Sequence, residues 1–158
     1  VFCGLATKNL AITAGIRDIE RLFVAGLLQN FGELIVAKIS PELAKKCEAY
    51  NVNILPWQLQ QQVLGFTYTE VSAELLKIWQ IPEKIILPIR HYNNAQNIEI
   101  NKDVKVLYLA SRLALVDNVD AALCQSLHIS KDDLEDAANF ATIETENILN
   151  IMNAKFYG

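Results

Sequence analysis

Apolar residues recur at helical spacing along most of the chain, and this periodicity constrains the fold more than any other feature. Ile19, Leu22, Phe23, Gly26 and Leu27, for example, stand at i, i+3, i+4, i+7 and i+8, so a helix places them in one stripe. No stretch shows sustained alternation of apolar and polar residues between hairpin turns. The sequence therefore predicts an all-α fold.

Glycine and proline mark several expected helix ends. Gly15 is expected to close a first helix over about 4–14, because glycine readily takes the left-handed conformation found at helix ends. Gly65 is expected to end a Gln-rich helix that starts at Pro56. Gly32 is expected to interrupt the apolar run of the second helix.

A further helix is expected over 70–79. Thr69 is the predicted N-cap, because a threonine oxygen can accept hydrogen bonds from the first free N–H groups of a helix. Val71, Leu75 and Ile78 are the predicted buried stripe.

The last two long helices have different patterns. Residues 104–116 are apolar on nearly every side, which predicts a central, enclosed helix. Ser130 and Asp133 form a predicted capping box for a long C-terminal helix. The residues of that helix expected to face inward are Leu134, Ala138, Ala141, Ile148 and Met152.

Length and charge exclude several classes of protein. The 158 residues suit one domain, so we expect a single unit over 1–158. A net charge of -4 leaves no broad cationic field, which argues against a nucleic-acid partner. The longest uninterrupted apolar run, 22–28, is much shorter than the roughly 20 residues that span a bilayer. We therefore expect no membrane contact and a cytoplasmic protein.

The chain begins at Val1 without a visible secretory signal, which predicts that it was cut from a longer protein. Cys3, Cys47 and Cys124 are odd in number and lie in apolar helical patterns. Reduced thiols are therefore expected, in preference to a disulfide or a zinc site.

No phosphate-binding glycine loop, CxxC pair, HExxH helix or nucleophile elbow occurs in the sequence. His91 stands near the expected end of a helix, where a structural role is favoured, and His128 precedes a helix cap, where a surface or packing role is favoured. Glu70 and Glu74 share a helix face at i, i+4, a spacing that fits an acid/base pair or, more simply, a solvated charged face. Trp57 and Trp79 could line a ligand pocket, but both are expected to be core anchors.

Five segments in order, 25–34, 64–76, 79–82, 89–93 and 106–114, resemble the HDOD domain. This HD-related output domain of bacterial signalling proteins is a relative of HD-type metal phosphohydrolases. The resemblance implies an HD-domain-like helical bundle. It also implies that the chain is the C-terminal, HD-like portion of a longer protein.

The resemblance further implies that the metal-ligand positions of catalytic HD enzymes are occupied here by Gln29, Asn30, Tyr68, Tyr92 and Asn93. Neutral amides and phenols cannot offset the lost hydration shell of a divalent cation as carboxylates do. We therefore expect no metal, no cofactor and no catalysis. The five side chains are expected instead to form a neutral hydrogen-bonded network.

The leading hypothesis is a catalytically inactive signalling module that contacts a signalling protein or an attached receiver or output domain. One alternative is a small-ligand pocket for nucleotides, in which Trp57 and Tyr68 stack and Gln29 and Asn30 form hydrogen bonds.

A second alternative is a residual metal-dependent phosphohydrolase. Its expected groups are Glu33, Glu70, Glu74 and His91, in an arrangement different from that of the HD enzymes.

Overall fold

The computed structural model describes residues 1–51, 53–95, 101–115 and 120–156. Within these residues every regular element is a helix, and the only β interaction is an isolated bridge between Asn51 and Ile54. The predicted all-α fold is confirmed. The elements, in order, are α1 (Phe2–Thr13), α2 (Ile19–Leu28), α3 (Phe31–Ile39), α4 (Pro41–Cys47), α5 (Pro56–Leu64), α6 (Tyr68–Ile78), α7 (Glu83–Arg90), the 3-10 turn η1 (Tyr92–Asn94), α8 (Lys102–Ala114), α9 (Ala121–Ser126) and α10 (Lys131–Phe156).

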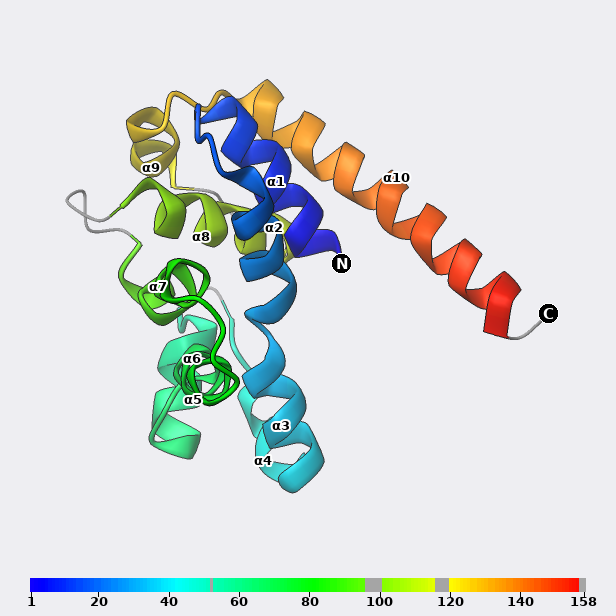
Figure 1. Ribbon diagram of the computed structural model, residues 1–158. Helices are drawn as coiled ribbons and strands as arrows, with labels where there is room; N and C mark the ends of the chain where they lie inside the picture. Colours follow the sequence, from blue (N-terminus) through cyan, green and yellow to red (C-terminus); the bar gives the residue numbers. More distant parts are fainter. Residues whose placement is uncertain (52, 96–100, 116–119, 157–158) are drawn as a thin grey trace.

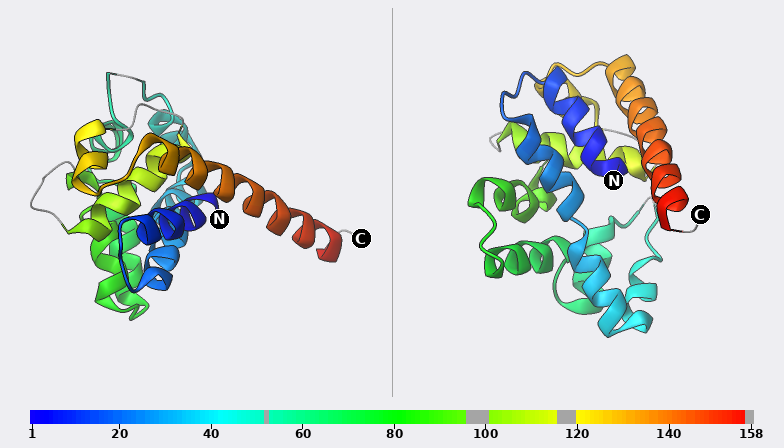
Figure 2. Two further views of the ribbon diagram at one scale, coloured as in Figure 1. Left: turned by 90° about the horizontal axis from the view of Figure 1, so that it is seen from above. Right: turned by 45° about the vertical axis from the view of Figure 1, so that its right-hand side comes forward.

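Helix α8 lies at the centre of the bundle, as its pattern predicts. Every residue from Asp103 to Arg112 is buried, and α1, α2 and α7 pack around it (Figures 1 and 2). The Arg21 guanidinium of α2 forms an ion pair with the Asp103 carboxylate of α8 and donates a hydrogen bond to it at 2.5 Å. Both side chains are largely buried. Because this ion pair joins α2 to α8, it helps to fix the direction in which α2 leads toward α3.

Helix α3 continues the direction of α2 and packs against α6, while α4 and α5 close the same end of the molecule (Figure 1). The expectation that Gly32 interrupts a helix is wrong. Gly32 lies in the first turn of α3, and the break falls at Gln29 and Asn30. A Cβ atom on Gly32 would lie 2.0 Å from the carbonyl oxygen of Tyr68. Glycine is therefore required there by the close contact of α3 with α6.

Other helix ends follow the sequence closely. Gly15 and Gly65 have φ values of 71° and 80°, in the left-handed region expected of glycine at a helix end. The predicted capping box of α10 is confirmed: the Ser130 amide donates to the Asp133 carboxylate at 2.7 Å, and the Asp133 amide donates to the Ser130 hydroxyl at 3.1 Å.

Thr67, not Thr69, is the N-cap of α6, so that prediction is wrong. The Glu70 amide donates to the Thr67 hydroxyl at 3.3 Å, and the Thr67 amide donates to the Glu70 carboxylate at 2.7 Å. This is a complete capping box, which needs an acidic residue three positions after the cap, and only Thr67 has one.

The predicted stripe of α6 is also wrong in part. The buried residues of the helix are Thr69, Ser72, Ala73 and Leu76, whereas Ile78 is 74% exposed. Trp79 is not the expected core anchor either, because it is 52% exposed and makes an edge contact with the Phe31 ring of α3. The small polar Ser72 is on the buried face because α6 lies close to the α2–α3 junction there.

Helix α10 packs on α1 and α8, and its partly buried residues extend to Ile148, whereas residues 149–155 are exposed. Leu134 and Ala141 are buried, but Met152 is 47% exposed, so the expectation that Met152 faces the core is wrong. The distal half of the helix extends away from the bundle (Figures 1 and 2). The helical stripe of α10 therefore continues beyond the surface that its first half covers.

The three cysteines are free, as predicted, with Cys47 and Cys124 buried and Cys3 partly buried. The stretch from Ile19 to Ile39 is apolar and long enough to cross a membrane, and a third of the tested window is buried in the structure. This stretch comprises α2 and α3, which are separate helices.

Candidate functional site

A cavity of about 240 Å³ lies where the α2–α3 junction meets α6, η1 and the end of α8. All five site residues expected from the sequence line it: Gln29, Asn30, Tyr68, Tyr92 and Asn93. Residues from α1, α4 and α5 complete the wall, among them Cys3, Cys47, Trp57 and Gln60. Segments that are far apart in the sequence therefore enclose one space.

Gln29 and Asn30 reach the cavity because the chain breaks between α2 and α3 at these two residues. The fully buried Ser72 of α6 holds this break in place. Its hydroxyl donates to the Gln29 carbonyl at 2.6 Å and accepts from the Gly32 amide at 2.8 Å. Ser72 thus satisfies two backbone groups that the helix break leaves without helical partners.

Tyr68 is the first residue of α6 and lies next to Gly32, whose missing side chain lets α3 approach its carbonyl group. The Tyr68 amide donates to the Gln60 side chain at 2.8 Å, which ties α6 to α5. Burial, followed by the neighbouring Cys47 thiol, raises the pKa of the Tyr68 phenol. This phenol therefore stays neutral in the physiological range.

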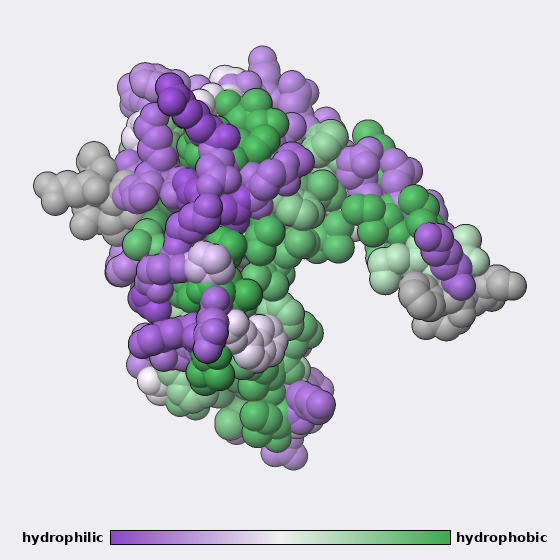
Figure 3. All heavy atoms as spheres, viewed as in Figure 1, coloured by the Kyte–Doolittle hydropathy of each residue, from purple (hydrophilic) through white to green (hydrophobic). Residues whose placement is uncertain are grey.

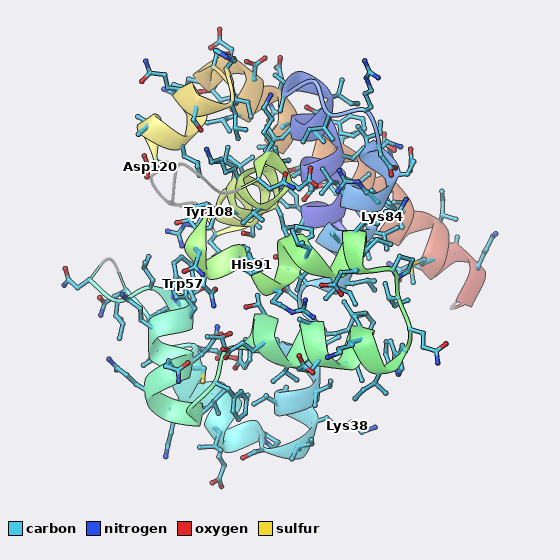
Figure 4. The ribbon with its side chains drawn as sticks, turned by 60° about the vertical axis from the view of Figure 1, so that its left-hand side comes forward. Lys38, Trp57, Lys84, His91, Tyr108 and Asp120 are labelled. Carbon is cyan, nitrogen blue, oxygen red and sulfur yellow. The ribbon has the colours of Figure 1, made fainter. Side chains whose placement is uncertain are left out.

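Tyr92 forms the buried floor of the cavity. Its hydroxyl shares a hydrogen bond of 2.5 Å with Ser111 of α8, and burial raises the pKa of its phenol. The ring makes an edge contact with Trp57, with centroids 5.7 Å apart, and lies 5.5 Å from the Tyr108 ring. Figure 4 labels Trp57 and Tyr108, which come from α5 and α8. Trp57 packs among aromatic rings as expected, and it also lines the cavity.

Asn93 contributes an unpaired acceptor. Its Nδ2 donates to the Thr67 hydroxyl at 3.3 Å, while its Oδ1 is buried and has no hydrogen-bond partner among the described residues. A buried acceptor without a partner costs about 1–3 kcal/mol. A donor from a bound molecule would remove that cost.

The expected network among the five side chains is not present in the described hydrogen bonds. The Gln29 amide donates a hydrogen bond to the Cys3 sulfur. The Tyr92 hydroxyl shares a hydrogen bond with the Ser111 hydroxyl, and the Asn93 amide donates one to the Thr67 hydroxyl. Each of these three therefore bonds a residue outside the set of five. Cys3, Ser111 and Thr67 lie within hydrogen-bond distance of these three side chains and take the bonds.

Two carboxylates that line the cavity, Glu33 of α3 and Glu48 after α4, are exposed and therefore lie at its open side. Although much of the Glu33 side chain is exposed, the cavity wall partly removes water from its carboxyl group, and this desolvation first, and the like charge of Glu48 second, raise its pKa. The sequence suggested Glu33 only as part of a residual hydrolase. It gave no signal for Glu48, which comes near Glu33 only through the packing of α4 on α3.

The structure does not bring the expected hydrolase residues together. Glu33 lines the first cavity, whereas Glu70 lines a second cavity beside α5 and is committed to the capping box of α6. Glu74 is exposed and lines neither cavity. His91, labelled in Figure 4, is exposed at the C-terminal end of α7, the structural position expected for it. His128 is also exposed.

The residues of the first cavity do not fit a divalent metal centre. Such a centre needs several carboxylate, imidazole or thiolate ligands around one point. Across the described parts of the chain, no three His, Cys, Asp or Glu residues are grouped so that they could hold a metal ion. The five side chains at the expected ligand positions are amides and phenols, which bring no negative charge, and the two carboxylates of the lining, Glu33 and Glu48, lie at the open side.

Known proteins share this fold. A "Putative signal transduction protein" of Marinobacter aquaeolei VT8 superposes with a TM-score of 0.70 at 18% identity, over 96% of this chain and 38% of that one. A "Putative phosphohydrolase" of Shewanella amazonensis SB2B superposes with a TM-score of 0.67 at 22% identity, over 89% of this chain and 56% of that one. At these identities the likeness concerns the fold, which is that of an HD-type helical bundle.

The sequence itself identifies the family. The family model of the HDOD domain matches residues 1–95, and the chain belongs to the HDOD domain family. An "Uncharacterized protein" of Treponema pallidum (strain Nichols) is 31% identical over 74 residues, which are 46% of this chain and 14% of that protein. The chain thus spans less than two thirds of each of these relatives.

Proposed function

We propose that the chain is a catalytically inactive HDOD module of a bacterial signal transduction protein, and that it acts through contacts with other proteins. The observation that carries the proposal is the chemistry of the first cavity. Amides and phenols surround the point at which the segments of the HD fold converge, with the nearest carboxylates at the open side. Such a lining favours a structural or binding role over hydrolysis.

The residues at the expected metal-ligand positions argue against hydrolysis of phosphate esters. In HD-type enzymes a metal ion lowers the pKa of a bound water and stabilises charge on the phosphate. Gln29, Asn30 and Tyr68 supply neither the anionic charge that holds such an ion nor a general base at neutral pH.

Exposed apolar surface supports a role in protein contacts. On α3, Leu34 is 63% and Ile39 is 78% exposed, and on α10 Ile143 and Ile151 are each 57% exposed. Figure 3 shows hydrophobic residues running down α2 and α3 and along the side of α10 that faces them. Exposed apolar patches of this kind mark interaction surfaces in many proteins.

The proposed partner is a signalling protein or a receiver or output domain of the same polypeptide, with this chain as its C-terminal HD-like portion and the cytoplasm as its location. Two observations support this context: membership in the HDOD family, and a structural neighbour named as a signal transduction protein. The neighbours are also longer than this chain.

A hydrolysis assay tests the catalytic half of the proposal. The chain is incubated with phosphodiester and phosphomonoester substrates in the presence of Mg²⁺, Mn²⁺ or Zn²⁺, beside its Glu33→Gln and Glu70→Ala variants. We expect no turnover above the metal-only reaction for any of the three. Metal-dependent turnover that either substitution abolishes would overturn the proposal.

Hydrogen exchange tests the proposed contacts with other proteins. In the full-length gene product, α3 is expected to exchange more slowly than in this chain alone, and Leu34→Asp or Ile39→Asp is expected to remove that protection. Lys38→Asp, an exposed change on the same helix, is the matched control. Equal exchange of α3 in the two proteins would contradict a contact at this surface.

Small-ligand binding is a second candidate function, because the cavity has room for a ligand and carries the unpaired Asn93 acceptor. A nucleotide is disfavoured. Its phosphates would meet the Glu33 and Glu48 carboxylates at the open side, and the described lining contains no lysine, arginine or histidine.

A further inference from the structure

We propose that the first cavity binds a small primary-amine cation, with Glu33 and Glu48 as its counter-charges and the aromatic wall as its binding surface. The proposal starts from charge. Apart from these two glutamates, the described residues of the lining are apolar, polar or weakly acidic, and none is basic. A cation that enters at the open side therefore meets the two carboxylates first, while the Arg112 guanidinium acts on the Tyr92 floor from outside the lining.

Aromatic rings provide the second element. Trp57 and Tyr92, with Tyr50 and Tyr68, contribute ring surface to the lining. The edge contact between Trp57 and Tyr92 fixes these two rings relative to each other. Ammonium groups are attracted to the faces of such rings, and the attraction is stronger where water is partly excluded.

Hydrogen-bond acceptors provide the third element and select an amine over other cations. The buried Oδ1 of Asn93 has no partner among the described residues, because the Nδ2 of the same amide is directed to Thr67. Asn30 is exposed at the cavity, and no described hydrogen bond uses its side chain. An ammonium N–H can donate to such oxygens, whereas a quaternary ammonium cannot.

The volume of the cavity limits the size of the ligand. The volume of about 240 Å³ lies just below the range of roughly 300–1,000 Å³ that is typical of pockets for drug-sized ligands. A short alkylamine fits such a space. A bare metal ion is much smaller than this volume and lacks a group of three suitable ligands among the described residues.

The inference rests on the proposed absence of a metal centre, because a divalent ion at the same place would occupy the acceptors. Its test uses the whole chain and 1,4-diaminobutane as the probe. Trp79→Phe leaves Trp57 as the single tryptophan of the protein, so its fluorescence reports on the cavity wall. Titration calorimetry on the unchanged chain gives an independent affinity. The comparison probes are 1,4-butanediol, tetramethylammonium and AMP.

We expect saturable binding of the diamine and no binding of the neutral diol or of AMP. Glu33→Gln and Glu48→Gln should each weaken diamine binding by about fivefold, as expected for the loss of one partly solvated ion pair. Glu74→Gln, an exposed change that removes the same charge from α6 away from the cavity, should leave the affinity unchanged.

Three results would overturn the inference. They are no saturable binding of the diamine, a diamine affinity of the Glu33→Gln and Glu48→Gln variants equal to that of the unchanged chain, or binding of tetramethylammonium as tight as that of the diamine. These outcomes leave the proposed non-catalytic module intact. A parallel titration with Mn²⁺ separates the two proposals, since tight metal binding in the cavity would remove the module proposal as well.

Discussion

Substitution of Gly32 by alanine tests how the cavity is held open at the α2–α3 junction. A Cβ atom at this position would lie 2.0 Å from the Tyr68 carbonyl oxygen, 2.8 Å from its carbonyl carbon and 3.0 Å from its Cα. All three atoms belong to the backbone, so no side chain can rotate away. The first turn of α3 must therefore move by about 1 Å from the start of α6, which weakens the Gly32 amide bond to Ser72.

Two effects of Gly32→Ala oppose each other. Alanine favours a helix over glycine by about 1 kcal/mol. Overpacking against a fixed backbone costs about 1–3 kcal/mol, and a weakened buried hydrogen bond adds about 1 kcal/mol. The net loss in the free energy of unfolding is therefore about 1–3 kcal/mol. For a domain of this size it lowers the Tm by roughly 2–4 °C per kcal/mol.

Thermal and urea unfolding followed by circular dichroism measure this loss. Lys38→Ala, an exposed change on the same helix, is the control and should stay within about 0.5 kcal/mol of the parent chain. If Gly32→Ala were as stable as the parent or more stable, helix propensity would have prevailed. The close contact between α3 and α6 would then not hold the junction.

Three further predictions concern other parts of the molecule. Ser72→Ala should lower the free energy of unfolding by about 2 kcal/mol in urea titration, because two backbone groups lose a buried partner; a loss below about 0.5 kcal/mol would contradict this role. Burial raises the pKa of Cys3 to about 12 and also raises that of Tyr92, so the unfolded chain ionises first. Stability should therefore fall as the pH rises above about 9, the ordinary thiol pKa, and a Tm that is constant from pH 8 to 10.5 would refute this linkage. Leu134→Ala should cost about 2–4 kcal/mol, whereas Ile151→Asn on distal α10 should cost less than about 0.5 kcal/mol; equal costs would show that both halves of the helix are packed.

The sequence predicted the helices well because their signals are local. Gly15 and Gly65 end helices through their own conformational freedom, and the Ser130–Asp133 box forms within one turn. The cap of α6 was misplaced at Thr69, although the acidic residue three positions after Thr67 was visible in the sequence. The complete capping box satisfies two backbone groups and a single cap residue only one, which is why α6 begins after Thr67.

The wrong predictions of buried residues on α6 and α10 have a different cause. Periodicity shows which residues share a helix face, but it does not show how far a neighbouring element extends along that face. Ile78 and Met152 therefore fit apolar stripes and are nevertheless exposed. Conversely, Ser72 looks like a surface residue and is fully buried, because its partners lie about 40 residues earlier in the chain.

The candidate site was predictable only through the family resemblance. The order of motifs brought Gln29, Tyr68 and Asn93 into one set, and the structure places them around one cavity. The charge at the open side of that cavity was not predictable. Glu48 follows a short helix with no motif, and its position beside Glu33 depends on how α4 turns back on α3.

Titration of Mn²⁺ into the chelator-treated chain, followed by electron paramagnetic resonance, tests the central claim most directly. Bound Mn²⁺ loses the sharp spectrum of the aqueous ion, so the signal counts the free metal. A cavity that places amides and phenols at the ligand positions, and no group of three metal ligands among the described residues, predicts a signal that matches the protein-free buffer at equimolar protein. Depletion of one equivalent of Mn²⁺, abolished by Tyr68→Phe or Glu33→Gln, would contradict the account.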